Sequence, residues 1–338
     1  MRVPIKEVRI KQYVISNYLL DVKKVERIKN SYKILTKDKE YCLKVVEYEF
    51  SHFIFIISAI KHLQKNGFKN IPQFICNKNG KQYGKIDNYF IYLTEWIPSR
   101  VSNYNNPIEL ERVSAKLGEL HECSKNFIVN RKMKPRIYWF SWIKTFETRL
   151  EEILDFKKRI GQKFYKSDFD KIYLENIDKE ITKGNNVIES LKRNNYFDVM
   201  QKEVFKGGFC HHDYANHNIL VDTEGGLNVI DFDYCILDSH IHDLASLLIR
   251  NMKNNRWNEK KADKIIDSYS RCSEVNLYEI PIMREFMKFP QSFWQLGLQA
   301  YWEQQPWGNE TFNIRLKRYI EDEKERSEFL DDYFRGGN

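Results

Sequence analysis

The stretch from Cys210 to Ala245 constrains the fold and the chemistry of this chain more than any other part. It reads CHHDYANHNILVDTEGGLNVIDFDYCILDSHIHDLA. Two short apolar runs, Ile219–Asp222 and Leu227–Ile230, flank the segment Asp222–Gly226, which is rich in turn-forming residues. Such a pattern predicts a β-hairpin. The chain therefore has to place the residues on either side of this hairpin next to each other.

Three polar residues gain a role from that hairpin. Asn218 precedes its first strand and Asp231 follows its second, so an amide oxygen and a carboxylate lie side by side. Mg²⁺ prefers such oxygen ligands and takes others from substrate phosphates. Asp213, on the loop before Asn218, is placed to orient an incoming hydroxyl and accept its proton. This is the metal-and-base arrangement of a phosphoryl-transfer site, although Asp and Asn are also common in ordinary surface turns.

The order of these residues resembles a known group of kinases. The pattern H-x-D-x-x-x-x-N, then I-D-F-[DE], then D-L-A, is that of the aminoglycoside phosphotransferase and choline kinase superfamily, whose members are related to the protein kinases. Here the pattern is carried by His211–Asn218, Ile230–Asp233 and Asp243–Ala245. Two longer segments, Ile230–Arg250 and Phe293–Glu303, resemble the CotS family of spore coat proteins. This resemblance extends from about Tyr18 to Tyr333.

The resemblance implies an α+β fold with two lobes, like that of the protein kinases. A β-rich, nucleotide-binding lobe is expected over residues 1–97, and a helical lobe with the catalytic loop and the acceptor site over residues 98–338. It implies ATP and Mg²⁺ as cofactors. Asp213 is then the base, Asn218 and Asp231 hold the metal, and Lys44 reaches the α- and β-phosphates. Thr94, Glu95, Trp96 and Ile97 form the hinge that contacts the nucleotide base.

The hydrophobic patterning of the chain agrees with two such lobes. Strands are expected in the first hundred residues, over Val22–Ile28, Tyr32–Thr36, Tyr41–Val46, Gln73–Cys76, Gln82–Ile86 and Tyr89–Ile97, with one helix over Ser51–Leu63. Beyond Pro98 the pattern is helical, over Pro107–Cys123, Tyr138–Ile160, Ser167–Asn194, His242–Asn251, Asn258–Ser270 and Asn309–Tyr333.

Two departures from the kinase pattern bear on activity. The phosphate-binding lysine normally pairs with a glutamate inside the next helix, but Phe53–Ile60 contains no acid, so Glu47 or Glu49 would have to substitute. The turn Ile28–Lys33, which corresponds to the loop that covers the phosphates, contains no glycine. Glycines there allow backbone N–H groups to approach phosphate oxygens closely. These departures leave open a catalytically inactive structural coat component that retains the fold.

Composition limits the other function classes. The formal charge of +8 favours anionic partners. However, basic and acidic residues are interspersed, and the one compact basic cluster, Arg131–Arg136, is interpreted as a solvated loop rather than as a nucleic-acid site. No apolar run is long enough to span a membrane. The amino-terminal stretch lacks the features of a secretory signal, so we expect synthesis in the cytoplasm and incorporation into the spore coat, with other coat proteins as partners.

The cysteines and the remaining histidines carry weaker signals. The six cysteines show no zinc or disulfide spacing, which indicates buried, reduced thiols. Cross-links through cysteine or tyrosine in a coat stay open. His212, His217, His240 and His242 match no compact metal motif. His211 is expected to brace the catalytic loop and Asp243 to anchor its backbone, while Asp233 either assists Asp231 or caps a turn.

The acceptor side is the least legible part of the sequence. Aromatic residues recur at helical spacing, which indicates either core packing or a cation-binding surface to which Glu303 adds charge. They are Phe293, Trp294, Tyr301, Trp302 and Trp307, with Leu298 among them. The sequence does not separate a small-molecule acceptor from a protein side chain. The leading hypothesis is Mg²⁺-dependent transfer of the ATP γ-phosphoryl group to a hydroxyl.

Overall fold

A computed structural model describes residues 5–334 of the chain. Residues 1–4, where the stretch examined for a secretory signal begins, and residues 335–338 lie outside the described part. The chain forms two compact units that are discontinuous in sequence. The sheet unit comprises Met1–Glu109, Phe127–Arg136 and Ala215–Cys235, and the helical unit comprises Leu110–Asn126, Ile137–Tyr214 and Ile236–Asn338. These units are discontinuous in sequence, whereas the two predicted lobes are continuous. The lobe boundary that we predict after Ile97 therefore stays a prediction.

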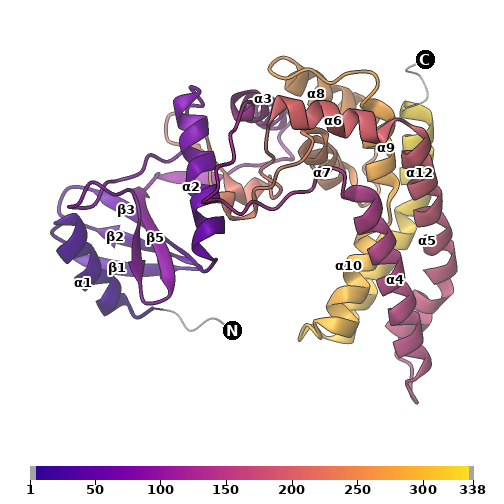
Figure 1. The fold of residues 1–338 in the computed structure, drawn as a ribbon. Helices are drawn as coiled ribbons and strands as arrows, with labels where there is room; N and C mark the ends of the chain where they lie inside the picture. The colour runs from indigo at the N-terminus through magenta and orange to yellow at the C-terminus, as the bar shows by residue number, and fades with distance from the viewer. Residues whose placement is uncertain (1–4, 335–338) are drawn as a thin grey trace. The chain divides into compact units, whose positions relative to one another are not determined.

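The sheet unit is built on a five-stranded antiparallel sheet with the order β1-β2-β3-β5-β4. Figure 1 shows these strands with the helix α2, Phe50–Lys65, which buries Phe53, Phe55 and Ile56. Cross-strand pairs such as Tyr32 with Leu43 alternate buried and exposed positions along the strands, as a sheet with one buried face requires. The strands are β1 Lys24–Ile28, β2 Ser31–Leu35, β3 Glu40–Val46, β4 Gly84–Ile86 and β5 Tyr89–Glu95.

The helix α1, Glu7–Tyr18, was not expected from the sequence. It is rich in β-branched residues and has a weak amphipathic pattern, and only Ile10, Val14 and Tyr18 are buried. These three residues recur every fourth position and join the hydrophobic core of the sheet unit. The strand expected over Gln73–Cys76 is wrong, because that segment forms only an isolated bridge from Phe74 to Thr94.

A second, three-stranded sheet contains the predicted hairpin. Strands β7, Ile219–Asp222, and β8, Leu227–Val229, pair antiparallel, and the short strand β6, Ser99–Val101, pairs with β7. The hairpin prediction is confirmed. Strand β6 was missed because it is short, fully exposed and directly follows Pro98, so no periodicity marks it.

The helical unit consists almost entirely of helices packed on one another (Figure 1). The long helices α4, Trp142–Gly161, and α5, Asp168–Arg193, pack along each other, and α10, Gln291–Gly297, lies against α4. The other elements are α3 Pro107–Ser124 from Leu110 onward, α6 Tyr196–Lys206, α7 Ile241–Met252, α8 Glu259–Ser270, α9 Ile280–Lys288, the π-helix Leu298–Trp302, α11 Asn309–Glu321 and α12 Glu323–Tyr333.

Local sequence signals explain several limits of these helices. Ser167 caps α5 and forms a capping box with Asp170, as its position predicts. The single helix expected over Asn309–Tyr333 is interrupted at Asp322. Gly297 is required for packing, because a Cβ there would lie 2.3 Å from the Tyr173 hydroxyl and 2.4 Å from the Phe156 ring.

The predicted α+β class, with a sheet-containing part and a larger helical part, is therefore confirmed. Within residues 5–334, no helix has both the length and the apolar character needed to cross a membrane. The expectation of buried thiols is only partly right. All six cysteines are free, and Cys210 and Cys235 are buried, but Cys76 and Cys272 are exposed.

Candidate active site

The hairpin of the sheet unit brings two predicted metal ligands together. Ile219 pairs with Val229, and the N–H of Ile230 donates to the carbonyl oxygen of Asn218 at 3.0 Å. Asn218 therefore lies beside the residue that follows Ile230 in the chain, which is Asp231. The Asn218 side chain is almost fully buried. Both residues belong to the sheet unit, so the unit alone fixes their proximity.

Asp231 has an unusual backbone conformation. Its φ is 66°, in the left-handed region, and it precedes the 3₁₀ turn Phe232–Tyr234. Few residues other than glycine adopt this region, although Asp tolerates it better than most. Such conformations persist only where the surroundings enforce them, and they gather at functional loops. The turn carries Asp233 onto the same side as Asp231, since both carboxylates meet the same lysine.

That lysine is Lys44 of β3. Its Nζ lies 2.9 Å from a carboxylate oxygen of Asp231 and 3.4 Å from one of Asp233. Lys44 is only 8% exposed. Burial by itself lowers the pKa of Lys44, but the charges and hydrogen bonds of Asp233 and Asp231 outweigh it and hold the pKa above its ordinary value. The lysine stays charged.

The expected partners of Lys44 are wrong. We expected Glu47 or Glu49 to replace the missing helix glutamate, but the ion pairs of Lys44 go to Asp231 and Asp233. Glu49 instead lies 3.3 Å from Lys134. Glu49 is the N-cap residue of α2 and therefore lies at the helix entrance, outside the interior turns from which a helix glutamate would reach Lys44.

The donor set around Lys44 fits a hard divalent cation. Asn218 offers an amide oxygen, and Asp231 and Asp233 offer carboxylate oxygens, which are the ligand types that Mg²⁺ takes. Two carboxylates face one ammonium, so the group has surplus negative charge. The same two carboxylates act on Tyr92, which is buried in β5. Burial raises the pKa of Tyr92, and the charges of Asp233 and Asp231 raise it further.

The predicted hinge comprises the last two residues of β5 and the two residues that follow it. Thr94 is buried, and Glu95 lies 2.8 Å from Lys39. The Trp96 N–H donates to the Glu40 carbonyl at 3.0 Å, and Ile97 accepts a hydrogen bond from the Ser99 hydroxyl. The glycine-free turn between β1 and β2 is tight, and Lys29 takes the left-handed conformation there with a φ of 52°.

The predicted base, Asp213, belongs to the helical unit. Its Oδ1 accepts a hydrogen bond from Arg250 Nη2 of α7 at 3.0 Å, and both side chains are partly exposed. His212, the residue before it, has a left-handed backbone with a φ of 67°. Each of the two functional loops therefore contains one left-handed residue, His212 before Asp213 in one and Asp231 itself in the other.

Asp243 holds the catalytic loop in place. Its two carboxylate oxygens accept the backbone N–H groups of His211 at 2.7 Å and His212 at 2.9 Å. His121 Nε2 lies 3.3 Å from the same carboxylate. Burial raises the pKa of this carboxyl, but hydrogen bonding and charge from His121 dominate and lower it overall. The anchoring role expected for Asp243 is confirmed, and His211 is fully buried in the loop.

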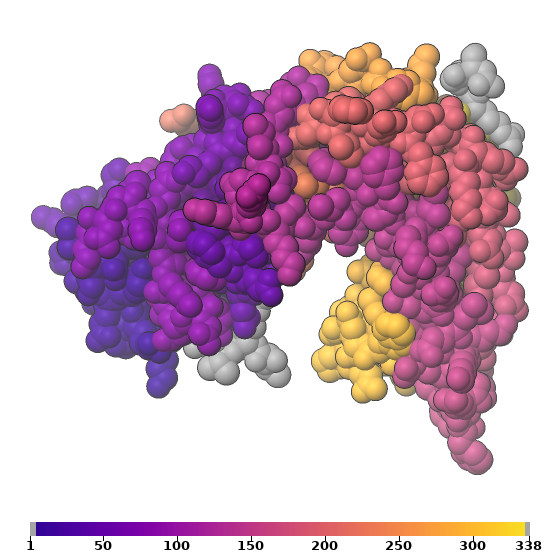
Figure 2. Space-filling model, viewed as in Figure 1, coloured from indigo at the N-terminus to yellow at the C-terminus, as the bar shows by residue number. Residues whose placement is uncertain are grey.

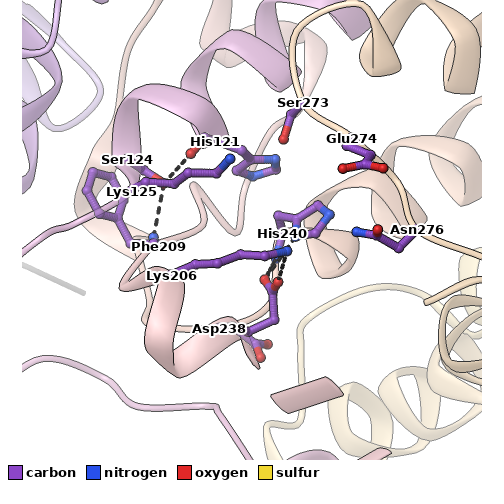
Figure 3. A pocket seen from close by; sticks show the side chains of 12 residues that line it. His121, Ser124, Lys125, Lys206, Phe209, Asp238, His240, Ser273, Glu274 and Asn276 are labelled. Carbon is purple, nitrogen blue, oxygen red and sulfur yellow. Dashed lines mark hydrogen bonds and ion pairs between the residues drawn. The ribbon is translucent and has the colours of Figure 1, made fainter. Parts of the chain in front are cut away.

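Two of the histidines that we weighed for a zinc site, His240 and His242, lie against different carboxylates. His240 Nδ1 lies 2.9 Å from Glu203, and His242 Nδ1 lies 2.6 Å from Asp238. Figure 3 shows His240 at a cavity of about 80 Å³ that Lys206 also lines. The Lys206 ammonium lies 2.6 Å from Glu203, so it supplies the positive charge that the buried carboxylate needs.

Sequence reasoning missed Arg250 as a partner of the base. A usable signal exists, because Arg250 stands seven residues after Asp243, which is two helical turns and thus the same face of α7. The aromatic residues predicted for the acceptor side differ in their burial. Phe293 and Tyr301 are core residues, as expected, whereas Trp302 is 43% exposed and Trp307 is 38% exposed.

Comparison with known proteins agrees with this geometry. A family model described as "Spore coat putative kinase YutH" matches residues 11–333. The fold resembles an aminoglycoside phosphotransferase from Alicyclobacillus acidocaldarius, with a TM-score of 0.85, 19% identity and coverage of 100% of this chain and 98% of that one. The predicted kinship to CotS-like coat proteins and to aminoglycoside phosphotransferases is confirmed.

Two further structures have nucleotides bound. Spectinomycin phosphotransferase APH(9)-Ia, in complex with ADP and spectinomycin, has a TM-score of 0.67 and 15% identity, covering 98% of this chain and 99% of that one. Amicoumacin kinase hAmiN, in complex with AMP-PNP, Ca²⁺ and Ami, has a TM-score of 0.63 and 16% identity, covering 97% of this chain and 94% of that one. Choline kinases also share the fold.

Proposed function

Because the chain belongs to the YutH family of spore coat kinases, we propose that it is a coat protein that transfers the γ-phosphoryl group of ATP to a hydroxyl. The observation that carries this proposal is the buried ion pair of Lys44 with Asp231 and Asp233 beside Asn218. A lysine and oxygen ligands held together in this way are the parts that bind nucleotide phosphates and their metal. The nucleotides in the two complexes with the same fold support it.

Each residue has a distinct task in this proposal. Lys44 binds the α- and β-phosphates of ATP, and residues Thr94–Ile97 contact its base. Asn218 and Asp231 hold Mg²⁺, with Asp233 beside them. When bound, Mg²⁺ neutralises charge that develops on the phosphate oxygens. The left-handed turn at Asp231 fixes its carboxylate in advance, so its orientation costs little when the nucleotide binds.

Asp213 orients the acceptor and takes its proton. The hydroxyl oxygen forms a bond to the γ-phosphorus while the bond from that phosphorus to the β–γ bridging oxygen breaks, and ADP leaves with the electron pair. The hydroxyl proton passes to the Asp213 carboxylate. Arg250 holds this carboxylate from one side at 3.0 Å, which fixes its orientation. Asp243 fixes the backbone of the same loop through His211 and His212.

A structural coat component without catalysis is the second candidate, and the glycine-free turn at Lys29 favours it. In either case the spore coat is the proposed location and other coat proteins are proposed partners. The absence of glycine weakens only the backbone contacts to phosphate. The Lys44 cluster, in contrast, favours the first candidate, since burying Lys44 and Asp233 beside a partly exposed Asp231 costs stability that apolar residues would not.

The experiment is ADP formation by the purified protein with ATP and Mg²⁺ and without an added acceptor, so that water takes the place of the hydroxyl. We expect slow, Mg²⁺-dependent turnover that D213N lowers by about 10²–10⁴-fold, the usual contribution of a general base. D38N, which removes an exposed carboxylate of the sheet unit, should leave turnover unchanged. If ATP binds but no Asp213-dependent turnover occurs, the structural candidate stands instead.

A further inference from the structure

The aromatic rings of α10, of the π-helix that follows it and of the segment before α11 already bind cations from the protein itself. In Figure 2 this part, coloured yellow, is open at the surface beside the magenta helix α4. The ring faces of Trp294, Tyr301 and Trp307 hold Arg149 at 4.5 Å, Lys163 at 5.0 Å and Arg315 at 4.6 Å, respectively. Since these faces are occupied, they do not form an open surface for a quaternary ammonium ligand.

Neutral groups hold Arg149 of α4. Its Nη1 donates to the Gln291 side-chain oxygen at 2.7 Å, and its guanidinium lies over Trp294. The carboxylate of Glu152 is nearby but accepts the indole N–H of Trp294. Within residues 5–334, Arg149 forms no ion pair with a carboxylate. Burial lowers the pKa of Arg149 to about 10, and the nearby charge of Glu152 offsets only part of this shift.

Arg315 of α11 repeats this arrangement. Its Nη1 donates to the side-chain oxygen of Gln299 at 3.1 Å, and its guanidinium lies over Trp307. Burial lowers its pKa as well. In the described part of the chain no carboxylate lies within ion-pair distance of it. Two arginines of the same unit are therefore held by glutamine and tryptophan, which are neutral groups.

Positive charge continues from Arg315 towards the base. Burial, followed by repulsion from Arg250, Arg315 and Arg256, lowers the pKa of Lys253, which directly follows α7. These side chains thus share one electrostatic neighbourhood. Arg250 reaches Asp213 itself. Of the four cations Arg149, Arg250, Lys253 and Arg315, which we name the acceptor cations, only Arg250 has an ion-pair partner among residues 5–334.

Arg149 is also connected to the catalytic loop through packed rings. The ring of Trp142, at the start of α4, contacts that of His242 at 5.9 Å, and His242 contacts His212 at 5.0 Å. Arg149 stands seven residues after Trp142, about 10 Å along the helix.

Partly buried cations without counter-ions are costly unless a ligand supplies the missing charge. We propose that the acceptor cations bind an anionic group, a phosphate or a carboxylate, that the hydroxyl acceptor carries. This inference rests on the proposed function, because the acceptor is the substrate of that reaction. The acceptor site is then opposite in charge to one that binds a polycationic aminoglycoside or choline.

The test measures binding by titration calorimetry without nucleotide, so turnover is not needed. The probes are glycerol 3-phosphate, which is an anionic alcohol, and its neutral and cationic counterparts glycerol and choline. We expect only the anion to bind to the wild-type protein. R149Q should weaken its binding by about 10–100-fold, the loss of one charge-assisted hydrogen bond. R149K should restore part of the affinity, and added salt should lower it.

Lys157→Gln is the matched control, because it removes one positive charge from an exposed position of the same helix. It should bind the anion as the wild type does. Without ligand, R149Q should unfold at the same temperature as the wild type or at a higher one. If Arg149 were merely structural, R149Q would unfold at a lower temperature. Three outcomes would overturn the inference. The wild type binds choline as well as the anion, R149Q binds the anion as the wild type does, or the wild type does not bind the anion at millimolar concentrations. A protein that binds the anion but not ATP contradicts only the proposed function.

Discussion

The sheet unit and the helical unit solve the same electrostatic problem in opposite ways. In the sheet unit, two carboxylates enclose one buried ammonium, that of Lys44, and negative charge is in surplus. In the helical unit, Arg149 and Arg315 lie against glutamine and tryptophan, and positive charge is in surplus. A site with a surplus of charge of one sign favours a ligand of the opposite charge. The first surplus fits a divalent cation and the second an anionic acceptor.

The largest expected effect comes from removing the cation of the sheet unit. K44M leaves Asp231 and Asp233 facing each other without an ammonium. Breaking a buried ion pair costs about 3–5 kcal/mol, and the partial exposure of Asp231 reduces the expected loss of unfolding free energy to about 2 kcal/mol. Denaturant titration measures it. ATP affinity should fall about 10–100-fold, because a charged hydrogen bond to phosphate is lost.

K23M is the control for this variant, since Lys23 forms an exposed pair with Asp21. Exposed pairs contribute about 0–1 kcal/mol. If K44M and K23M were equally stable and bound ATP equally well, the sheet unit would lack the charge cluster on which the comparison rests.

The next effect is an acid sensitivity of the helical unit. The folded-state pKa of Asp243 lies below its ordinary value, so its stabilisation is complete above the unfolded pKa of about 4 and is lost as the pH falls below it. Burial also lowers the pKa of His121, whose contribution fades as the pH falls below about 6.5. Unfolding free energy should therefore decline from pH 7 towards pH 3 in two steps.

D243N should remove the lower step and destabilise the catalytic loop at neutral pH. A flat profile between pH 7 and pH 3 in the wild type, or the same slope in D243N, would contradict the role given to this carboxylate. Denaturant titrations at each pH are the measurement, with D38N as a variant in which the carboxylate lost is an exposed one of the sheet unit.

The smallest effect is expected for the cation beside the base. R250Q should lower turnover by about tenfold, because Asp213 loses its orientation while keeping its charge. Both side chains of this pair are partly exposed, so stability should change by less than about 1 kcal/mol. R250K should recover part of the activity. Steady-state ADP formation measures this, and R318Q, at an exposed position of α11, serves as the charge control. Unchanged turnover in R250Q would limit Arg250 to a surface role.

Spacing along the chain predicted what is local. The hairpin β7–β8 and its flanking residues Asn218 and Asp231 lie within a short stretch, where turn chemistry fixes the register. The anchoring by Asp243 and the long helix α5 with its cap at Ser167 were equally readable. In the hairpin and at the cap of α5, a residue and its partner share one element or two adjacent ones, whereas Asp243 and His211 are 32 positions apart.

Contacts between distant residues were not predictable. Lys44 and Asp231 are 187 positions apart, so the sequence gives no sign that Asp231 takes the place of a helix glutamate. The partners of Arg149 and Arg315 are neutral, and no charge pattern marks them. The sequence-based prediction missed the helix α1 for another reason. Its β-branched residues favour strands, and only packing against the sheet overrides that preference.

The central claim is that the sheet unit holds a working nucleotide site. Thermal unfolding with and without ATP and Mg²⁺, for the wild type, D231N and D38N, tests it most directly, because a ligand that binds the native state must raise its stability. We predict a rise in the wild type and in D38N that requires both ATP and Mg²⁺ and is lost in D231N. No rise at millimolar nucleotide in the wild type, or an equal rise in D231N, would contradict the account.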